Sequence, residues 1–162
     1  MAENGMEPDR LNTQLNDMVV LVDDEPNIRE TVAFILEAEG VEVETGSDGV
    51  EGLEAVRRCK PKVVLLDVMM PRMDGYEVCR AIRSDPELQG VFVMILTARG
   101  QKSDEAKALE VGADLYMSKP FDDEVVMQVI RDVFDGRLVS KQGSTEDGPV
   151  VHYQRTGAGA AG

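Results

Sequence analysis

Residues 62–75 read KVVLLDVMMPRMDG, and this stretch predicts how the rest of the chain folds. Its residues 63–66 form a continuous apolar run, which is typical of a strand covered on both faces in a parallel sheet. The run ends at Asp67, after which Pro71 and the Asp74-Gly75 pair indicate a turn before a helix. A carboxylate in this place lies at the edge where open α/β sheets bind ligands. Taken alone, Asp67 is equally well explained as a cap of the following turn.

Apolar strands and amphipathic helices alternate through most of the chain. Strands are predicted at residues 18–22, 41–45, 63–66, 91–96 and 115–117, and helices at about 26–40, 48–60, 76–83, 103–111 and 122–134. The second strand alternates apolar and polar side chains, so we expect it at an edge of the sheet. Five strand–helix units predict an α/β fold, in which helices cover both faces of a five-stranded, doubly wound parallel sheet.

Short-range signals predict how the second helix begins and which face it buries. Asp48 and Glu51 resemble a capping pair, in which each residue satisfies a backbone group of the other. Val50, Leu53 and Val56 follow at helical spacing, so we expect all three to face the core.

The ends of the chain differ in composition from the middle. Residues 1–17 are polar and aperiodic, which predicts a flexible lead-in. Residues 18–136 contain all the predicted strands and helices and form one domain. Residues 137–162 are polar and then rich in glycine and alanine, so we expect a flexible tail that is too short to form a second domain.

Charge and composition exclude several classes of function. The net charge of −14 argues against direct binding to nucleic acid, which needs basic contacts to phosphates, and against an anionic membrane surface. No apolar run approaches the ~20 residues of a membrane span, and the first residues do not resemble a signal peptide. Cys59 and Cys79 lack a metal-binding or disulfide-rich spacing, so reduced thiols and a cytoplasmic location are expected.

Four predicted strands end on polar residues: Asp23 with Asp24, then Asp67, Thr97 and Lys119. If the strands run parallel, these side chains meet at one edge of the sheet. Three carboxylates held together repel one another unless a cation joins them, and all-oxygen ligands favour Mg²⁺. A carboxylate can attack phosphorus to form an acyl phosphate, while a hydroxyl and an ammonium can bind the phosphoryl oxygens. Each residue taken singly also has an ordinary explanation, such as acids at a helix N-terminus or a surface lysine.

Four motifs together resemble the receiver domains of response regulators in two-component signalling. They are VLVDDEP at 20–26, VVLLDVMMPRMDGYEV at 63–78, MILTAR at 94–99 and GADLYMSKPF at 112–121. The resemblance covers roughly residues 18–134. It implies a flavodoxin-like (CheY-like) fold with strand order 2-1-3-4-5, which places the first and third strands side by side at the topological switch point.

The resemblance also implies a role for each site residue. Asp67 corresponds to the phosphoacceptor. Asp24 corresponds to a direct Mg²⁺ ligand, Asp23 to a ligand through water, and the backbone carbonyl of Met69 to the remaining protein ligand. Met69 and Arg99 also occupy positions where members of the family tune the lifetime of the phosphoryl group.

Further residues correspond to those that respond to phosphorylation in the family. Thr97 corresponds to the hydroxyl that binds the phosphoryl group and follows it inward, and Lys119 to its cationic partner. The Lys119–Pro120 peptide bond is cis in the family, an isomer that proline tolerates. Tyr116 corresponds to the aromatic residue that moves from an exposed to a buried position on activation.

These correspondences imply a stand-alone signalling receiver. A sensor histidine kinase or phosphotransfer protein is expected to phosphorylate Asp67 and so change a surface formed by the fourth helix, fifth strand and fifth helix of the family. That surface would bind an unknown downstream protein or a second copy in a homodimer. The chain is not expected to be a turnover enzyme, because it only phosphorylates itself and slowly dephosphorylates.

Two alternatives remain open. The chain is also consistent with the receiver portion of a longer regulator whose output domain is missing. An aspartyl-phosphate phosphohydrolase is the other alternative. Haloacid-dehalogenase-type phosphatases usually carry a second acid two residues after the nucleophile, where this chain has Met69.

Overall fold

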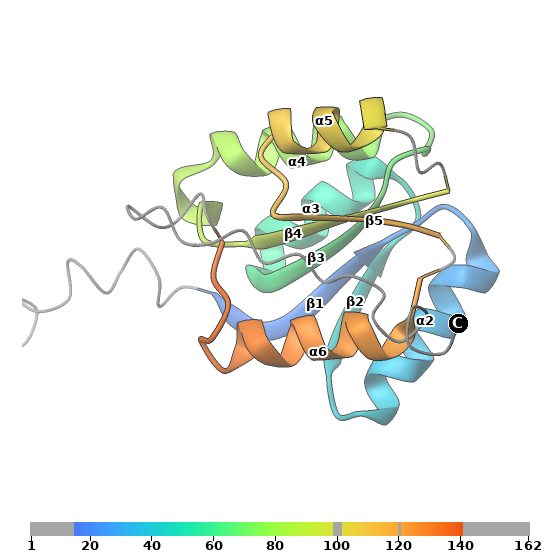
Figure 1. The fold of residues 1–162 in the computed structure, drawn as a ribbon, viewed down its shortest axis with the longest axis vertical. Helices are drawn as coiled ribbons and strands as arrows, with labels where there is room; N and C mark the ends of the chain where they lie inside the picture. The colour runs from blue at the N-terminus through green and yellow to red at the C-terminus, as the bar shows by residue number, and fades with distance from the viewer. Residues whose placement is uncertain (1–14, 99–101, 120, 141–162) are drawn as a thin grey trace, which may run out of the picture.

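The computed structural model describes residues 15–98, 102–119 and 121–140. Within them, a five-stranded parallel sheet has the order β2-β1-β3-β4-β5 (Figure 1). The strands are β1 (Asn16–Val22), β2 (Glu42–Gly46), β3 (Pro61–Asp67), β4 (Phe92–Thr97) and β5 (Leu115–Ser118). The helices are α2 (Pro26–Ala38), α3 (Gly49–Cys59), α4 (Gly75–Ser84), α5 (Lys102–Glu110) and α6 (Asp123–Phe134), with a 3₁₀ turn η2 (Pro86–Leu88). The predicted fold class and strand order are confirmed, and β2 lies at an edge.

Two hydrophobic cores lie on opposite faces of the sheet. Helices α3, α4 and α5 cover one face, and α2 and α6 cover the other (Figure 1). The central strand β3 contributes to both cores, with Val64 and Leu66 on the first face and Val63 and Leu65 on the second. This explains its uninterrupted apolar run, because neither face of β3 meets solvent. None of the helices in the described part of the chain has the length and apolar character that a membrane crossing requires.

The orientation of α3 differs from the prediction at one residue. Leu53 and Val56 are buried as expected, but Val50 is 42% exposed, so its predicted core position is wrong. The reason is a close approach of α3 to β1 at Gly52. A Cβ atom on Gly52 would lie 2.5 Å from the Val22 side chain. The helix therefore presents a glycine to the sheet, and this rotates Val50 toward solvent.

The cap of α3 is formed by residues on both sides of its first turn. One carboxylate oxygen of Asp48 accepts a hydrogen bond from the backbone N–H of Glu51 at 2.8 Å, as predicted. The Glu51 carboxylate reaches one residue further back than expected, because it accepts from the N–H of Ser47 at 2.9 Å. The first interaction satisfies a donor that the helix start leaves without an intrahelical partner, and the second ties the residue before the cap to the first turn.

Packing extends slightly beyond the predicted domain boundaries. Strand β1 begins at Asn16, whose side-chain amide donates to the carbonyl of Cys59 at 2.7 Å. After α6, Leu138 packs on the core that α2 and α6 cover, and Ser140 is only 3% exposed. The Ser140 hydroxyl donates to Asp114 Oδ1 at 3.0 Å. Residues 1–14 and 141–162, most of the predicted lead-in and tail, lie outside the described residues.

The two cysteines are free thiols in different surroundings. Cys79 is fully buried in α4, and burial raises the pKa of its thiol to about 11. Cys59 is partly exposed, and burial raises its thiol pKa as well. Because the thiolate is the reactive form, we expect an aromatic disulfide reagent at pH 8 to label Cys59 in the folded protein and Cys79 only after unfolding. A Cys59→Ser variant should show no labelling before denaturant is added, and prompt labelling of that variant would contradict the burial of Cys79.

Candidate functional site

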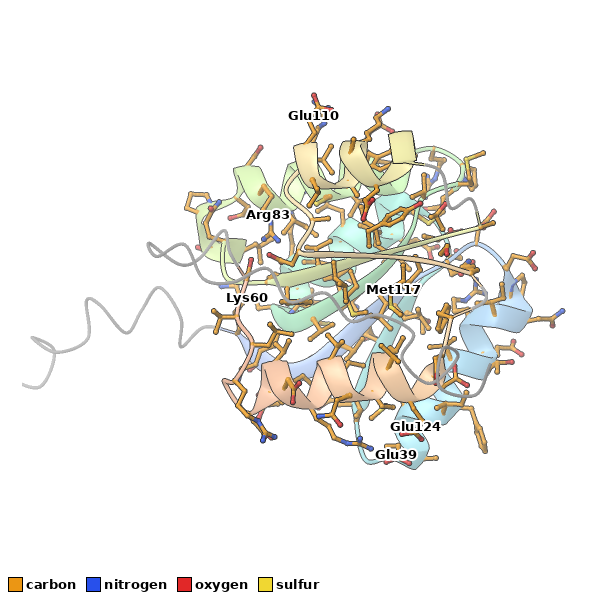
Figure 2. The ribbon with its side chains drawn as sticks, viewed as in Figure 1. Glu39, Lys60, Arg83, Glu110, Met117 and Glu124 are labelled. Atoms are coloured by element: carbon orange, nitrogen blue, oxygen red, sulfur yellow. The ribbon has the colours of Figure 1, made fainter. Side chains whose placement is uncertain are left out.

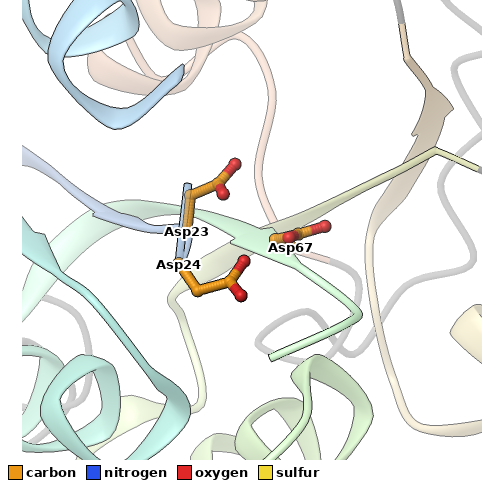
Figure 3. Close-up of side chains that lie close together, drawn as sticks. All are labelled: Asp23, Asp24 and Asp67. Carbon is orange, nitrogen blue, oxygen red and sulfur yellow. The ribbon is translucent and has the colours of Figure 1, made fainter. Parts of the chain in front are cut away.

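Three carboxylates meet at the carboxyl ends of two adjacent strands. Asp23 and Asp24 follow the last residue of β1, and Asp67 is the last residue of β3. The two strands pair in parallel, with Val22 opposite Leu66. One carboxylate oxygen from each acid lies within 4.8 Å of the others (Figure 3). The meeting of these acids, predicted from the strand ends, is therefore present in the structure.

Asp67 is a buried carboxyl group, with 7% of its surface exposed. Its Oδ1 accepts a hydrogen bond from the N–H of Val68 at 2.9 Å and lies 3.5 Å from the Lys119 ammonium. Burial raises the pKa of Asp67 to about 6, although Lys119 opposes the rise; the nearby charge of Asp23 adds to it. Burial therefore makes the anionic form of Asp67 more costly than that of an exposed aspartate, and a further positive charge in the cluster would offset this cost.

Asp23 is held more firmly than its neighbour Asp24. Its Oδ1 accepts from the N–H of Glu25 at 2.9 Å, and its Oδ2 accepts from the Lys119 ammonium at 3.0 Å. Arg29 adds a hydrogen bond to the Asp23 backbone carbonyl at 2.7 Å. Asp23 is buried, whereas Asp24 is exposed. Both carboxylate oxygens of Asp23 thus already accept hydrogen bonds, while Asp24 faces the solvent side of the cluster.

The remaining predicted site residues lie around this cluster. Thr97, the last residue of β4, is 2% exposed, and its carbonyl accepts from the N–H of Lys119 at 2.6 Å. Tyr116 is half-buried and packs against the core that α3, α4 and α5 cover. It lies opposite Ile95 in the sheet, two residues before the end of β4. The side chain of Met69 is 59% exposed. Lys119 thus contacts the acids directly, Thr97 ends a neighbouring strand, and Tyr116 lies further back on the sheet.

Two residues singled out in the sequence cannot be placed. Arg99 and Pro120 lie outside the described residues. The cis Lys119–Pro120 bond and the tuning position at Arg99 therefore stay predictions.

The loop between Asp67 and α4 is tightly folded. The N–H of Gly75 donates to the carbonyl of Val68 at 2.9 Å. A Cβ atom on Gly75 would overlap the backbone carbonyl oxygen of Asp67, so only glycine allows this approach. Two further contacts near the site were not predicted from the sequence: the hydrogen bond from Arg29 to the Asp23 carbonyl and the salt bridge between Arg72 and Asp48. Neither has a local sequence signal.

The donors at this edge fit a magnesium ion. All three side chains offer carboxylate oxygens, the ligands that Mg²⁺ prefers, and one of them is exposed, where bound waters can complete the coordination. The raised pKa of Asp67 also favours a bound cation, because a cation would offset the cost of the buried negative charge.

Comparisons with known proteins point to one family. The family model "Response regulator receiver domain" matches residues 19–131. "Response regulator MprA" of Mycobacterium leprae is 43% identical over 113 residues, which are 70% of this chain and 49% of that protein. The "DNA-binding dual master transcriptional regulator RpaA" of Synechocystis is 35% identical over 113 residues, 70% of this chain and 47% of that protein. The chain thus spans about half the length of these curated relatives.

The fold of this chain is also similar to that of a solved structure. The chemotaxis protein CheY4 of Vibrio cholerae is 32% identical to this chain, with a TM-score of 0.67. The likeness covers 72% of this chain and 97% of that protein.

Proposed function

The chain belongs to the response regulator receiver domain family, and from this premise we propose that it carries a signal by accepting a phosphoryl group on Asp67. The donor is a phosphohistidine on a sensor histidine kinase or phosphotransfer protein. One observation carries the proposal: Asp67 is a buried carboxyl group at the end of β3, with two further acids and the Lys119 ammonium around it.

The proposed transfer uses groups already in place. An Asp67 carboxylate oxygen attacks the phosphorus, a P–O bond forms, and the P–N bond to the donor imidazole breaks. Lys119 lies 3.0 Å from Asp23 and 3.5 Å from Asp67, so its ammonium can turn to a phosphoryl oxygen. The hydroxyl of Thr97 binds another phosphoryl oxygen.

Mg²⁺ is the proposed cofactor of this transfer. Asp24 and Asp67 would hold it directly, Asp23 through water, and Met69 through its backbone carbonyl. The double hydrogen bonding of Asp23 supports an indirect role for that residue. When bound, the ion supplies positive charge that offsets the charge of the transferring group.

The proposed output is a changed surface on α5, β5 and α6. Phosphorylation adds charge beside Thr97, draws Thr97 and Tyr116 inward and shifts an equilibrium between two arrangements of this surface. The half-buried position of Tyr116 against the core supports this role. A difference in affinity worth about 1–3 kcal/mol for a protein partner or a second copy suffices for a switch. On this proposal the chain does not turn over an external substrate, and its acyl phosphate is lost by slow autodephosphorylation.

A second candidate function is that of the regulatory half of a longer regulator. The observation that favours it is the length of the relatives, of which this chain spans about half. The same phosphorylated site would then control an attached output domain. Partner capture by the isolated chain, dependent on phosphorylation, would favour the stand-alone form.

The decisive experiment is intact-mass spectrometry after incubation with Mg²⁺ and acetyl phosphate. We expect the mass to increase by one phosphoryl group. No increase is expected when EDTA is present during the incubation, or in an Asp67→Asn variant. Asp74→Asn is the matched control, because it removes an acid from the same loop while asparagine keeps the helix cap that Asp74 provides. Phosphorylation of Asp67→Asn at the wild-type level would refute the proposal.

A further inference from the structure

Arg72 has an unusual backbone conformation in the loop that follows the phosphoacceptor. Its φ angle is +70°, in the left-handed region that residues with a side chain seldom adopt. The other described non-glycine residue with positive φ is Lys60, at the C-terminus of α3. A disfavoured conformation persists only where the surroundings hold it, so contacts around Arg72 must hold this part of the loop.

The guanidinium of Arg72 binds the residue that caps α3. Its Nε donates to Asp48 Oδ2 at 2.9 Å, and a terminal nitrogen lies 2.9 Å from the same oxygen. The other oxygen of Asp48 accepts from the N–H of Glu51 at 2.8 Å. The Asp48 side chain is 14% exposed, so one shielded carboxylate joins the phosphoacceptor loop to the start of α3.

Backbone packing holds the same loop against α3. A Cβ atom on Gly49 would overlap the carbonyl oxygen of Met73, so the loop rests directly on the first residue of the helix. Within the loop, the N–H of Met73 donates to the Pro71 carbonyl at 2.7 Å. Helix α3 adds no acid to the cluster of Asp23, Asp24 and Asp67, yet it supports the loop between Asp67 and α4.

We infer that Arg72 and Asp48 form a clamp that positions the loop at residues 68–74 for cation binding. The clamp sets the path of the backbone that presents the Met69 carbonyl, and both residues act through that backbone without touching the phosphoryl group. This inference rests on the proposed function, because it assigns the clamp to the proposed Mg²⁺ site.

The decisive variant is Arg72→Asn. Asparagine tolerates the left-handed conformation better than most residues, so the backbone can stay while the clamp is lost. Two effects on Mg²⁺ affinity then have opposite signs. Removal of a positive charge strengthens cation binding by simple electrostatics, whereas loss of loop position weakens it. We expect the Mg²⁺ dissociation constant, measured by titration calorimetry, to rise about tenfold, as for groups that orient metal ligands indirectly.

Arg58→Asn is the matched control. Arg58 is as exposed as Arg72, 57% in both, and pairs with an acid at 3.2 Å, but that acid is Glu44 on the edge strand β2. The substitution makes the same change of charge away from the loop. We expect its Mg²⁺ affinity to equal the wild-type value or to exceed it slightly.

A measurement on the metal-free protein tests the clamp independently of Mg²⁺. The N–H groups of Met73 and Gly75 both donate to carbonyls of the loop. In EDTA, their amide protons should exchange with solvent faster in Arg72→Asn than in the wild type or Arg58→Asn. An Arg72→Asn variant with unchanged or tighter Mg²⁺ binding and unchanged exchange would overturn the inference. The proposed function would survive that result if the wild type still accepts a phosphoryl group. A wild type that binds no Mg²⁺ and accepts no phosphoryl group would overturn both.

Discussion

Arg83→Met is expected to lower the free energy of unfolding by about 3–5 kcal/mol, the usual cost of removing one partner from a buried ion pair. Arg83 lies near the end of α4 and reaches the backbone segments that precede β4 and β5 (Figure 2). Its guanidinium donates to the carbonyls of Gly112 at 2.8 Å, Val91 at 2.9 Å and Gln89 at 3.2 Å, and to the Asp114 carboxylate at 2.7 Å. The side chains of Arg83 and Asp114 are 10% and 1% exposed. Methionine fills much of the volume but leaves a buried carboxylate and three carbonyls without this donor.

Urea unfolding followed by circular dichroism measures this effect. The midpoint should fall while the slope stays constant, which marks a loss of stability without a change in the surface exposed on unfolding. Arg58→Met is the control, since it makes the same chemical change in an exposed pair with Glu44 and should cost less than about 1 kcal/mol. Equal losses in the two variants would show that burial of the Arg83 network adds nothing.

The fold was predictable because its signals are local and repeated. Continuous apolar runs in β1 and β3 indicate strands buried on both faces, and alternation in β2 indicates an edge. The orientation of α3 was predictable only in part. Hydrophobic spacing placed Val50 inward, but the contact of Gly52 with Val22 turns the helix, and such a contact depends on which strand lies beneath it.

The candidate site was predictable to the extent that it follows from strand ends. Parallel strands bring their carboxyl ends to one edge, so Asp23, Asp24 and Asp67 were expected to meet. The supporting ion pairs were not predictable. Arg83 and Asp114 are 31 residues apart in sequence and Arg72 and Asp48 are 24 apart, and no short-range pattern links charges at such separations.

Asp67→Asn is expected to stabilise the metal-free protein, by an amount that grows with pH. Burial raises the pKa of Asp67 from its ordinary 3.8 to about 6 in the folded state. Between pH 4 and 6 the folded state therefore binds more protons than the unfolded state, and stability falls as pH rises; above about pH 6 the full penalty applies. This difference in pKa corresponds to about 3 kcal/mol. Lys119 loses one acidic partner in the variant, which offsets part of this difference. We therefore expect the free energy of unfolding to increase by about 1–3 kcal/mol at pH 8 and by less toward pH 5.

Urea unfolding in EDTA at several values between pH 5 and 8.5 tests this expectation. Asp24→Asn is the control, because it removes a carboxylate from the same cluster at an exposed position, where no comparable burial penalty is relieved. Addition of Mg²⁺ should then stabilise the wild type more than Asp67→Asn, because ligand binding to the folded state adds stability and the variant lacks one proposed ligand. The difference in free energy of unfolding between the wild type and Asp67→Asn would then become smaller or change sign. If Asp67→Asn raised the free energy of unfolding equally at every pH, or lowered it at pH 8, the buried charge of Asp67 would not be what limits the stability of the metal-free protein.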